Sequence, residues 1–279
     1  MAPKVSKRPA ASTSTSCCKK SKYTPKRVEP DTGPTWYMKN IDAVKNLEHP
    51  QWAVHFLSLF GETVWGALKQ LFNGKLTINV WSDHCGMTTE MFASKHLRSY
   101  LYATYGVDVI FRLYGACDKC TKAKELTMIN HSPDHFTSDI YHRNLQAGTY
   151  DCDKCQSTHA LPSDGIHMYL SGFPCTPWSS RGTRTGFEHA DGKQYLQTCD
   201  TISWMNPVFF CIEHVLPQNS HSDRTEYAEM IRHMGAKLPN FNILSLAGID
   251  PRHSGYPASK PRFLAVGGRT DQIQETALC

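Results

Sequence analysis

The chain has 279 residues, of which 40% are hydrophobic and 20% charged, so it carries enough apolar material for one domain with a buried core. It contains no run of eighteen apolar residues and it begins with a polar, basic segment, which argues against a membrane span and against a secretory signal. Eleven cysteines without an export signal favour free thiols or metal ligands over a disulfide framework.

The net charge of +5 is concentrated at the N-terminus. Eight of the 30 Lys and Arg residues lie within the first 30 positions, beside a single acid, and the remainder of the chain is close to neutral. Lys7 and Arg8 are separated by ten residues from a second basic cluster at 19–22, the spacing of a bipartite nuclear-import signal. We therefore expect residues 1–35 to be a disordered tail that directs the protein to the nucleus. The alternative is a basic tail that contacts nucleic-acid phosphates without specificity.

The first half of the chain alternates helix-like and strand-like segments. Apolar residues at helical spacing predict an amphipathic helix over 51–72, ended by Asn73 and Gly74. The segments that follow are a strand at 76–83, a helix at 88–105, a strand at 107–115, a helix at 119–130, a short strand at 135–139 and a polar stretch at 140–165.

The second half continues this alternation. Its expected elements are a strand at 166–174, a glycine- and arginine-bearing loop at 179–192, a helix at 193–205, a strand at 207–215, and a strand, loop and strand between 242 and 269. The pattern predicts an α/β domain over 36–279, with a mostly parallel sheet covered by helices on both faces. Cys175 and Glu213 then follow or end adjacent strands, at the sheet edge where such folds bind ligands.

The stretch SGFPCTPWSS at 171–180 places a cysteine between two prolines. Pro174 and Pro177 restrict the backbone on both sides of Cys175, which suits a reactive thiol held in one direction. The alternative is an inert loop cysteine.

Three segments in order, GFPCTPWS, FFCIEHV and GYPASKPRFLAVG, resemble the motifs of cytosine-5 DNA methyltransferases. The resemblance covers about 76–267 and implies a Rossmann-like, S-adenosylmethionine-dependent methyltransferase fold. It implies that Cys175 is the nucleophile that adds to carbon 6 of cytosine, so that carbon 5 accepts the methyl group of S-adenosylmethionine. Glu213 would hydrogen-bond the flipped-out base, and Arg262 would shape the site.

The resemblance also implies cofactor and nucleic-acid contacts. The cofactor residues would be Trp81, Asp83, Gly86, Asp118, Asp139 and Pro174. The nucleic-acid contacts would be Ser179, Arg181, Arg184 and Lys260.

Several positions depart from the family pattern. Asp83 and Cys85 stand where the first motif has glycines, and we expect Asp83 to compensate by accepting a hydrogen bond from the cofactor's amino group. Ala116 occupies the position of the ribose-binding acid, with Asp118 two residues later. His214 replaces an asparagine of the acid motif, and Ala258 replaces a glutamine of the late motif.

The family's target-recognition region has no counterpart, since the chain ends soon after the late motif. The helix at 51–72 could replace the family's last helix beside the first strand. We expect DNA as the substrate, with a partner protein as a possible source of recognition; the alternatives are an RNA substrate and a catalytically silent module that binds nucleic acid or a partner.

The tetrapeptide CDKC occurs twice, with Cys117 and Cys120 in the first copy and Cys152 and Cys155 in the second. Free thiols are the favoured interpretation. The alternative is a zinc site that joins all four cysteines.

Overall fold

The computed structural model describes residues 69–70, 73–179, 182–183, 185–215, 221–250 and 260–271. Contacts divide the chain into two units, Met1–Thr35 and Trp36–Cys279, and only the second contains described residues. The basic tail with its import-like signal therefore lies outside them, as does nearly all of the expected helix at 51–72. None of the described helices is both long and apolar enough to cross a membrane.

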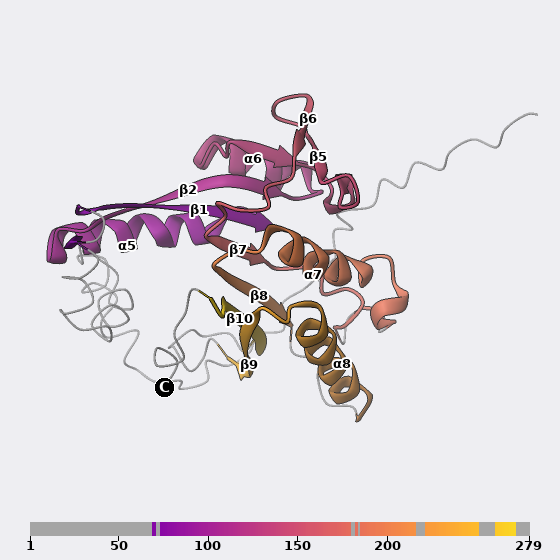
Figure 1. Ribbon diagram of the computed structural model, residues 1–279. Helices are drawn as coiled ribbons and strands as arrows, with labels where there is room; N and C mark the ends of the chain where they lie inside the picture. Colours follow the sequence, from indigo (N-terminus) through magenta and orange to yellow (C-terminus); the bar gives the residue numbers. More distant parts are fainter. Residues whose placement is uncertain are drawn as a thin grey trace, which may run out of the picture. The chain divides into compact units, whose positions relative to one another are not determined.

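Seven strands form the main sheet, in the order β3-β2-β1-β7-β8-β10-β9 (Figure 1). Their bounds are β1 Lys75–Asp83, β2 Asp108–Cys117, β3 His135–Thr137, β7 Met168–Ser171, β8 Phe209–Val215, β9 Phe241–Ile249 and β10 Arg262–Arg269. The first five in chain order pair in parallel, and β10 runs antiparallel to both β8 and β9. The predicted mostly parallel sheet is thus confirmed.

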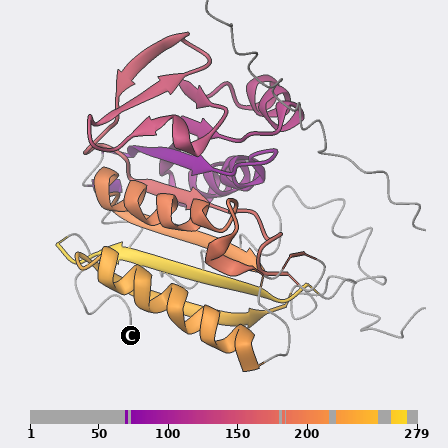
Figure 2. The same ribbon diagram turned by 90° about the vertical axis from the view of Figure 1, so that its right-hand side faces the viewer.

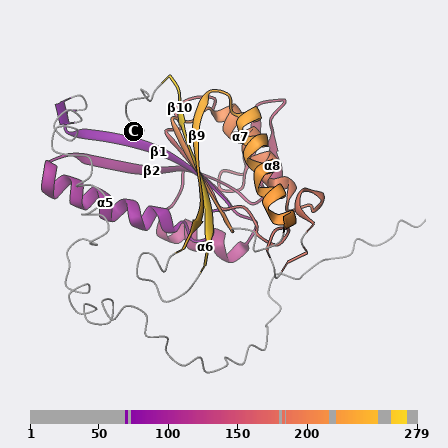
Figure 3. The ribbon, with the colours of Figure 1, turned by 90° about the horizontal axis from the view of Figure 1, so that it is seen from below.

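Helices cover both faces of this sheet (Figure 3). One face carries α5, Thr89–Tyr105, and α6, Thr121–Asn130; the other carries α7, Lys193–Met205, and α8, His221–Lys237. Successive side chains of β1 point to opposite faces of the sheet. Val80 belongs to the core beneath α5, whereas Trp81 belongs to the core shared with α7 and α8. Both side chains are almost completely buried.

A second, three-stranded antiparallel sheet lies at the β3 edge (Figure 2). It consists of β4, Arg143–Asn144, β5, Thr149–Cys152, and β6, Ser157–Ala160. The backbone N–H of Asp153 donates to the carbonyl of Phe136 on β3 at 2.7 Å, which joins the two sheets. The polar stretch predicted at 140–165 contains these three strands, which the sequence did not indicate because strands of two to four residues are too short to show alternation.

The chain order reverses between β1 and β7, which are neighbours in the sheet although five strands, β2 to β6, and two α-helices separate them along the sequence. In a doubly wound sheet this reversal opens a crevice beyond the carboxyl ends of the strands. The turn after Asp83 and the loop after Ser171 both start at that edge.

Candidate active site

The loop after β7 presents Cys175 to solvent. The backbone N–H groups of Trp178 and Ser179 both donate to the Cys175 carbonyl, at 3.0 and 2.8 Å, and so close a tight turn. The Trp178 ring is buried and packs edge-on against Phe187, with centroids 4.8 Å apart. The buried Trp178 therefore fixes the turn to the core, while Cys175 stays exposed to solvent.

Glu213 on β8 and Arg262 on β10 meet across an antiparallel pair of strands. The Arg262 guanidinium forms an ion pair with a Glu213 carboxylate oxygen, and it also donates to the Pro261 carbonyl at 3.1 Å. The Glu213 side chain remains 46% exposed, so its carboxylate can still contact a ligand. A Cβ on Gly172 would lie 3.6 Å from Glu213 Oε2, which places the start of the Cys175 loop against this carboxylate.

His214 lies on β8 beside Glu213 and packs against the loop that follows β7. Its buried ring stacks on Phe173, with centroids 4.1 Å apart and planes at 10°, and its Nε2 lies 3.4 Å from the Pro174 carbonyl. Burial lowers the pKa of His214 to about 4, so the ring is neutral near pH 7. Its one N–H can donate to only one of two carbonyls, that of Val215, 3.0 Å from Nδ1, or that of Pro174, 3.4 Å from Nε2. The sequence marks His214 only as a departure from the family pattern, whereas in the structure its ring packs against Phe173 and Trp178 of the loop.

The turn after β1 is built around a buried ion pair. Asp83 has no exposed surface, and both of its carboxylate oxygens accept from the guanidinium of Arg143 on β4. The Tyr169 hydroxyl and the Trp81 indole N–H, at 2.9 Å, complete its partners. Burial alone would raise the pKa of the Asp83 carboxyl, but Arg143 holds it below its ordinary value.

Two of the expected cofactor contacts do not fit this arrangement. Asp83 already has protein partners on both oxygens and no surface, which contradicts the prediction that it accepts a hydrogen bond from the cofactor. Trp81 is likewise fully buried in the core. Sequence reasoning also missed Arg143, because nothing in a polar stretch 60 residues away marks it as the partner of Asp83.

Three residues of this turn have left-handed backbone: His84, Gly86 and Thr88 have φ of 52°, 53° and 52°. Such conformations are costly for histidine and above all for a β-branched threonine. Hydrogen bonds hold them, since His84 contacts Ser171 Oγ at 3.1 Å and Thr88 contacts Thr127 Oγ1 at 2.9 Å. The turn thus keeps a glycine-like backbone path with few glycines.

Acidic residues follow β2 and β3, the two strands on one side of β1 in the sheet. The carboxylate of Asp118, just past β2, accepts the N–H of Gly86 and the N–H of Cys120, each at 2.8 Å. Asp139, just past β3, accepts the N–H of Tyr141 at 3.0 Å. Both carboxylates are partly exposed, whereas Ala116 is fully buried, so they lie at the expected edge of the sheet.

Of the expected nucleic-acid contacts, Ser179 is partly exposed directly after the nucleophile turn, and Lys260 is exposed just before β10. Arg181 and Arg184 lie outside the described residues. The interpretation of these four as DNA contacts stays a prediction.

The two CDKC segments do not meet in one cluster of potential ligands within the described part of the chain. Cys117 is buried at the end of β2, where burial raises the pKa of its thiol to about 12, and Cys120 is exposed at the start of α6. Cys152 and Cys155 lie beside two histidines instead. The alternative of a four-cysteine zinc site is therefore wrong.

A family model described as C-5 cytosine-specific DNA methylase matches residues 122–276, more than half of the chain. The chain belongs to this family. The matched segment contains Cys175, Glu213 and Arg262, and it begins after the turn that follows β1.

Two curated relatives are type II methyltransferases by name. The chain is 23% identical over 134 residues to the type II methyltransferase M.HpaII of Haemophilus parainfluenzae, covering 48% of this chain and 37% of that protein. It is 26% identical over 166 residues to M.MspI of Moraxella sp., covering 58% and 35%. The chain thus spans little more than a third of the length of these relatives.

Among solved structures, the chain is similar to a mutant of DNMT2 from Spodoptera frugiperda, with 16% identity, a TM-score of 0.44, and coverage of 71% of this chain and 51% of that one. It is also similar to the Dnmt2 methyltransferase of S. pombe, with 15% identity, a TM-score of 0.45 and coverage of 71% and 52%.

Family membership implies S-adenosylmethionine as the cofactor. The chain's own residues fit this group. A Cβ added to Gly86 would meet no atom within 4 Å, so a ligand can approach the backbone there. Asp118 and Asp139 offer carboxylates for hydroxyl and amino groups beside it, and Pro174 follows the adjacent strand.

Proposed function

We propose that this protein methylates carbon 5 of cytosine in DNA through a covalent adduct with Cys175. The observation that carries the proposal is the ion pair of Glu213 with Arg262, which lies beside the start of the exposed Cys175 loop, with the neighbouring His214 stacked on Phe173 of that loop. The three predicted catalytic residues come from three elements, and the sheet order brings those elements together.

Each of these residues has one task in the reaction. The Cys175 thiolate adds to carbon 6, a carbon–sulfur bond forms, and the electron pair of the 5,6 double bond moves toward carbon 5. Glu213 holds ring nitrogen 3 and the exocyclic amine, where charge changes during attack, and Arg262 orients Glu213. S-adenosylmethionine, when bound, supplies the methyl group. Loss of the proton from carbon 5 then expels the thiolate and restores the double bond.

A base in a duplex does not expose carbon 6 to a side chain, so the target must leave the stack. The exposed thiol, the half-exposed Glu213 and the exposed Lys260 support a substrate that approaches the site from solvent. The description of the matching family, C-5 cytosine-specific DNA methylase, favours DNA over RNA as that substrate.

We also infer nuclear import from the two basic clusters at 7–8 and 19–22. A fusion of residues 1–35 to a fluorescent protein should accumulate in nuclei. Replacing Lys19, Lys20 and Lys22 with Ala should abolish this accumulation, and equal distribution of both fusions would contradict the inference.

The activity is tested by transfer of a radiolabelled methyl group from S-adenosylmethionine to unmethylated duplex DNA, with tRNA in parallel. We expect label on cytosine carbon 5 of DNA and a loss of about 100-fold or more in Glu213→Gln. Glu229→Gln, an exposed change on α8, is the control and should retain full activity. Label on tRNA alone would refute the DNA substrate, and no label from a protein that binds the cofactor would refute the enzyme.

A further inference from the structure

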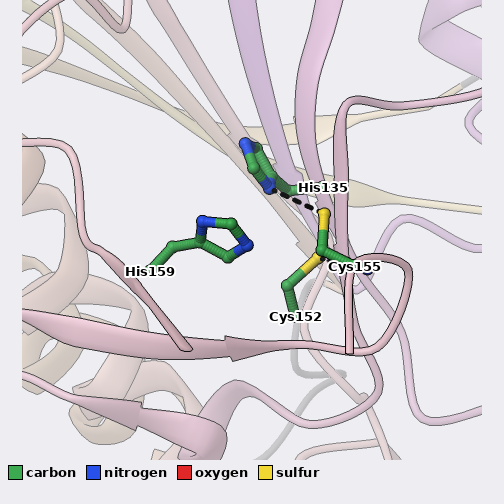
Figure 4. Close-up of side chains that lie close together, drawn as sticks. All are labelled: His135, Cys152, Cys155 and His159. Atoms are coloured by element: carbon green, nitrogen blue, oxygen red, sulfur yellow. Dashed lines mark hydrogen bonds between the residues drawn. The ribbon is translucent and has the colours of Figure 1, made fainter. Parts of the chain in front are cut away.

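Four potential metal ligands converge at the edge where the two sheets meet (Figure 4). His135 begins β3, Cys152 ends β5, Cys155 lies in the turn that follows, and His159 lies on β6. One ligand atom from each side chain lies within 4.8 Å of every other. No other such cluster occurs among the described residues.

We propose that these four side chains bind a structural zinc ion as a Cys2His2 site. Zinc bonds of about 2.3 Å to sulfur and about 2.0 Å to nitrogen place tetrahedral ligand atoms roughly 3.4 to 3.8 Å apart. Cys155 Sγ already lies 3.7 Å from His135 Nδ1. The widest separation, at most 4.8 Å, exceeds the tetrahedral value by only about 1 Å.

The turn between the two cysteines is prepared for a metal. The backbone N–H of Cys155 points at Cys152 Sγ, 3.4 Å away, a contact that stabilises negative charge on the sulfur. The turn is itself fixed to the main sheet through Asp153 N and the Phe136 carbonyl, at 2.7 Å.

Four protein ligands fill a tetrahedral zinc ion, so the site has no open position for a substrate and would be structural. The two thiols and two imidazoles also exclude calcium and magnesium, which prefer oxygen ligands. The Cys-x-x-Cys spacing is one that zinc sites use.

The zinc ion would stabilise the contact between the small sheet and the main sheet. Strands of two to four residues are only marginally stable by themselves. The ion would fasten β5 and β6 to β3, the edge strand of the main sheet. The small sheet carries Arg143, the partner of Asp83, and Tyr150, whose ring packs edge-on against Trp81 with centroids 5.4 Å apart. By holding the small sheet in place, zinc would stabilise the turn after β1 through the contacts of Arg143 and Tyr150.

The other CDKC segment is a control within the same chain. Cys120 has the same neighbours in sequence and is exposed like Cys155, yet it belongs to no cluster of potential ligands in the described part of the structure. Cys120→Ser and Cys155→Ser thus change the same motif in two places, and only one of them should affect the metal.

The test uses the full chain, purified without chelators, with metal content measured by mass spectrometry. We expect about one zinc per chain in the wild type and in Cys120→Ser, and less than about a tenth in Cys155→Ser and in His159→Asn. A metal-stripped wild type titrated with Co²⁺ should give the visible absorption of a tetrahedral ion and a thiolate-to-cobalt band. Both signals should be lost in Cys155→Ser.

Two results would overturn the site. One is a folded wild type without zinc and without a tetrahedral cobalt spectrum. The other is a full equivalent of zinc retained in both Cys155→Ser and His159→Asn. Because the spectrum is recorded on the wild type, a variant that fails to fold does not prevent the decision.

Discussion

The turn after β1 and the loop after β7 begin at neighbouring strand ends, but they keep their family pattern to different degrees. The loop holds Cys175 with its prolines, close to Glu213 and Arg262, and lies inside the matched family segment. The turn lies before that segment, and it departs from the family pattern by containing Asp83, which is buried and paired with Arg143.

The difference follows from what each region must supply. The proposed attack on carbon 6 needs particular atoms at fixed positions, the Cys175 thiolate and the Glu213 carboxylate. A cofactor turn needs mainly a backbone path, and hydrogen bonds from His84, Thr88 and Asp118 can hold such a path in place of glycines. The loop therefore depends mainly on which side chains it carries. The turn depends mainly on the path of its backbone.

The largest stability effect should come from breaking the ion pair in the turn. Asp83→Asn leaves the buried Arg143 charge without its anion, so the free energy of unfolding should fall by about 3 to 5 kcal/mol. The double change Asp83→Leu with Arg143→Met should recover much of this loss. The exposed pair of Arg98 and Asp108 is the control, and Asp108→Asn should cost less than about 1 kcal/mol in chemical denaturation. Equal losses in both regions would contradict the buried network.

The second prediction concerns His214 and acid. Its pKa is lowered to about 4 in the folded protein, against about 6.5 when unfolded, so its contribution is complete above pH 6.5 and is lost as the pH falls toward 4. This histidine should account for about 3 kcal/mol of acid destabilisation. His214→Asn restores the family residue, and denaturation curves at pH 7 and pH 4.5 should then differ by less than in the wild type. An unchanged difference would mean that His214 is not buried.

Asp83 should act in a different pH range. Its folded pKa is lower than its ordinary value, so its contribution persists down to about pH 4 and is lost only below that. The two regions are therefore separable by pH.

The smallest expected effect on stability comes from replacing a glycine with alanine, and it should differ between Gly115 and Gly172. A Cβ on Gly115 would lie 2.4 Å from the Trp81 ring, inside the core beside the turn, so Gly115→Ala should cost about 1 to 3 kcal/mol. A Cβ on Gly172, next to the loop, would make an ordinary contact of 3.6 Å with Glu213. Gly172→Ala should therefore shift thermal unfolding much less, and the reverse order would contradict the packing around Trp81.

The sequence was informative where a residue's chemistry is local. The alternation of elements predicted the main sheet, and the order of motifs predicted that Cys175, Glu213 and Arg262 belong together. It was not informative where two distant side chains meet in the core: Arg143 lies in a polar stretch that showed no strand pattern, and its partner Asp83 was expected to face a ligand. His135 and His159 were missed for the same reason, since short strands bring them to Cys152 and Cys155.

Covalent trapping on duplex DNA that carries 5-fluorocytosine tests the central claim most directly. Fluorine at carbon 5 cannot leave as a proton does, so an enzyme that attacks carbon 6 and transfers the methyl group stays attached. In the presence of S-adenosylmethionine we predict a shifted band on a denaturing gel for the wild type and for Cys120→Ser, and none for Cys175→Ser. A folded wild type that forms no adduct, or an adduct that persists in Cys175→Ser, would contradict the assignment of Cys175 as the nucleophile.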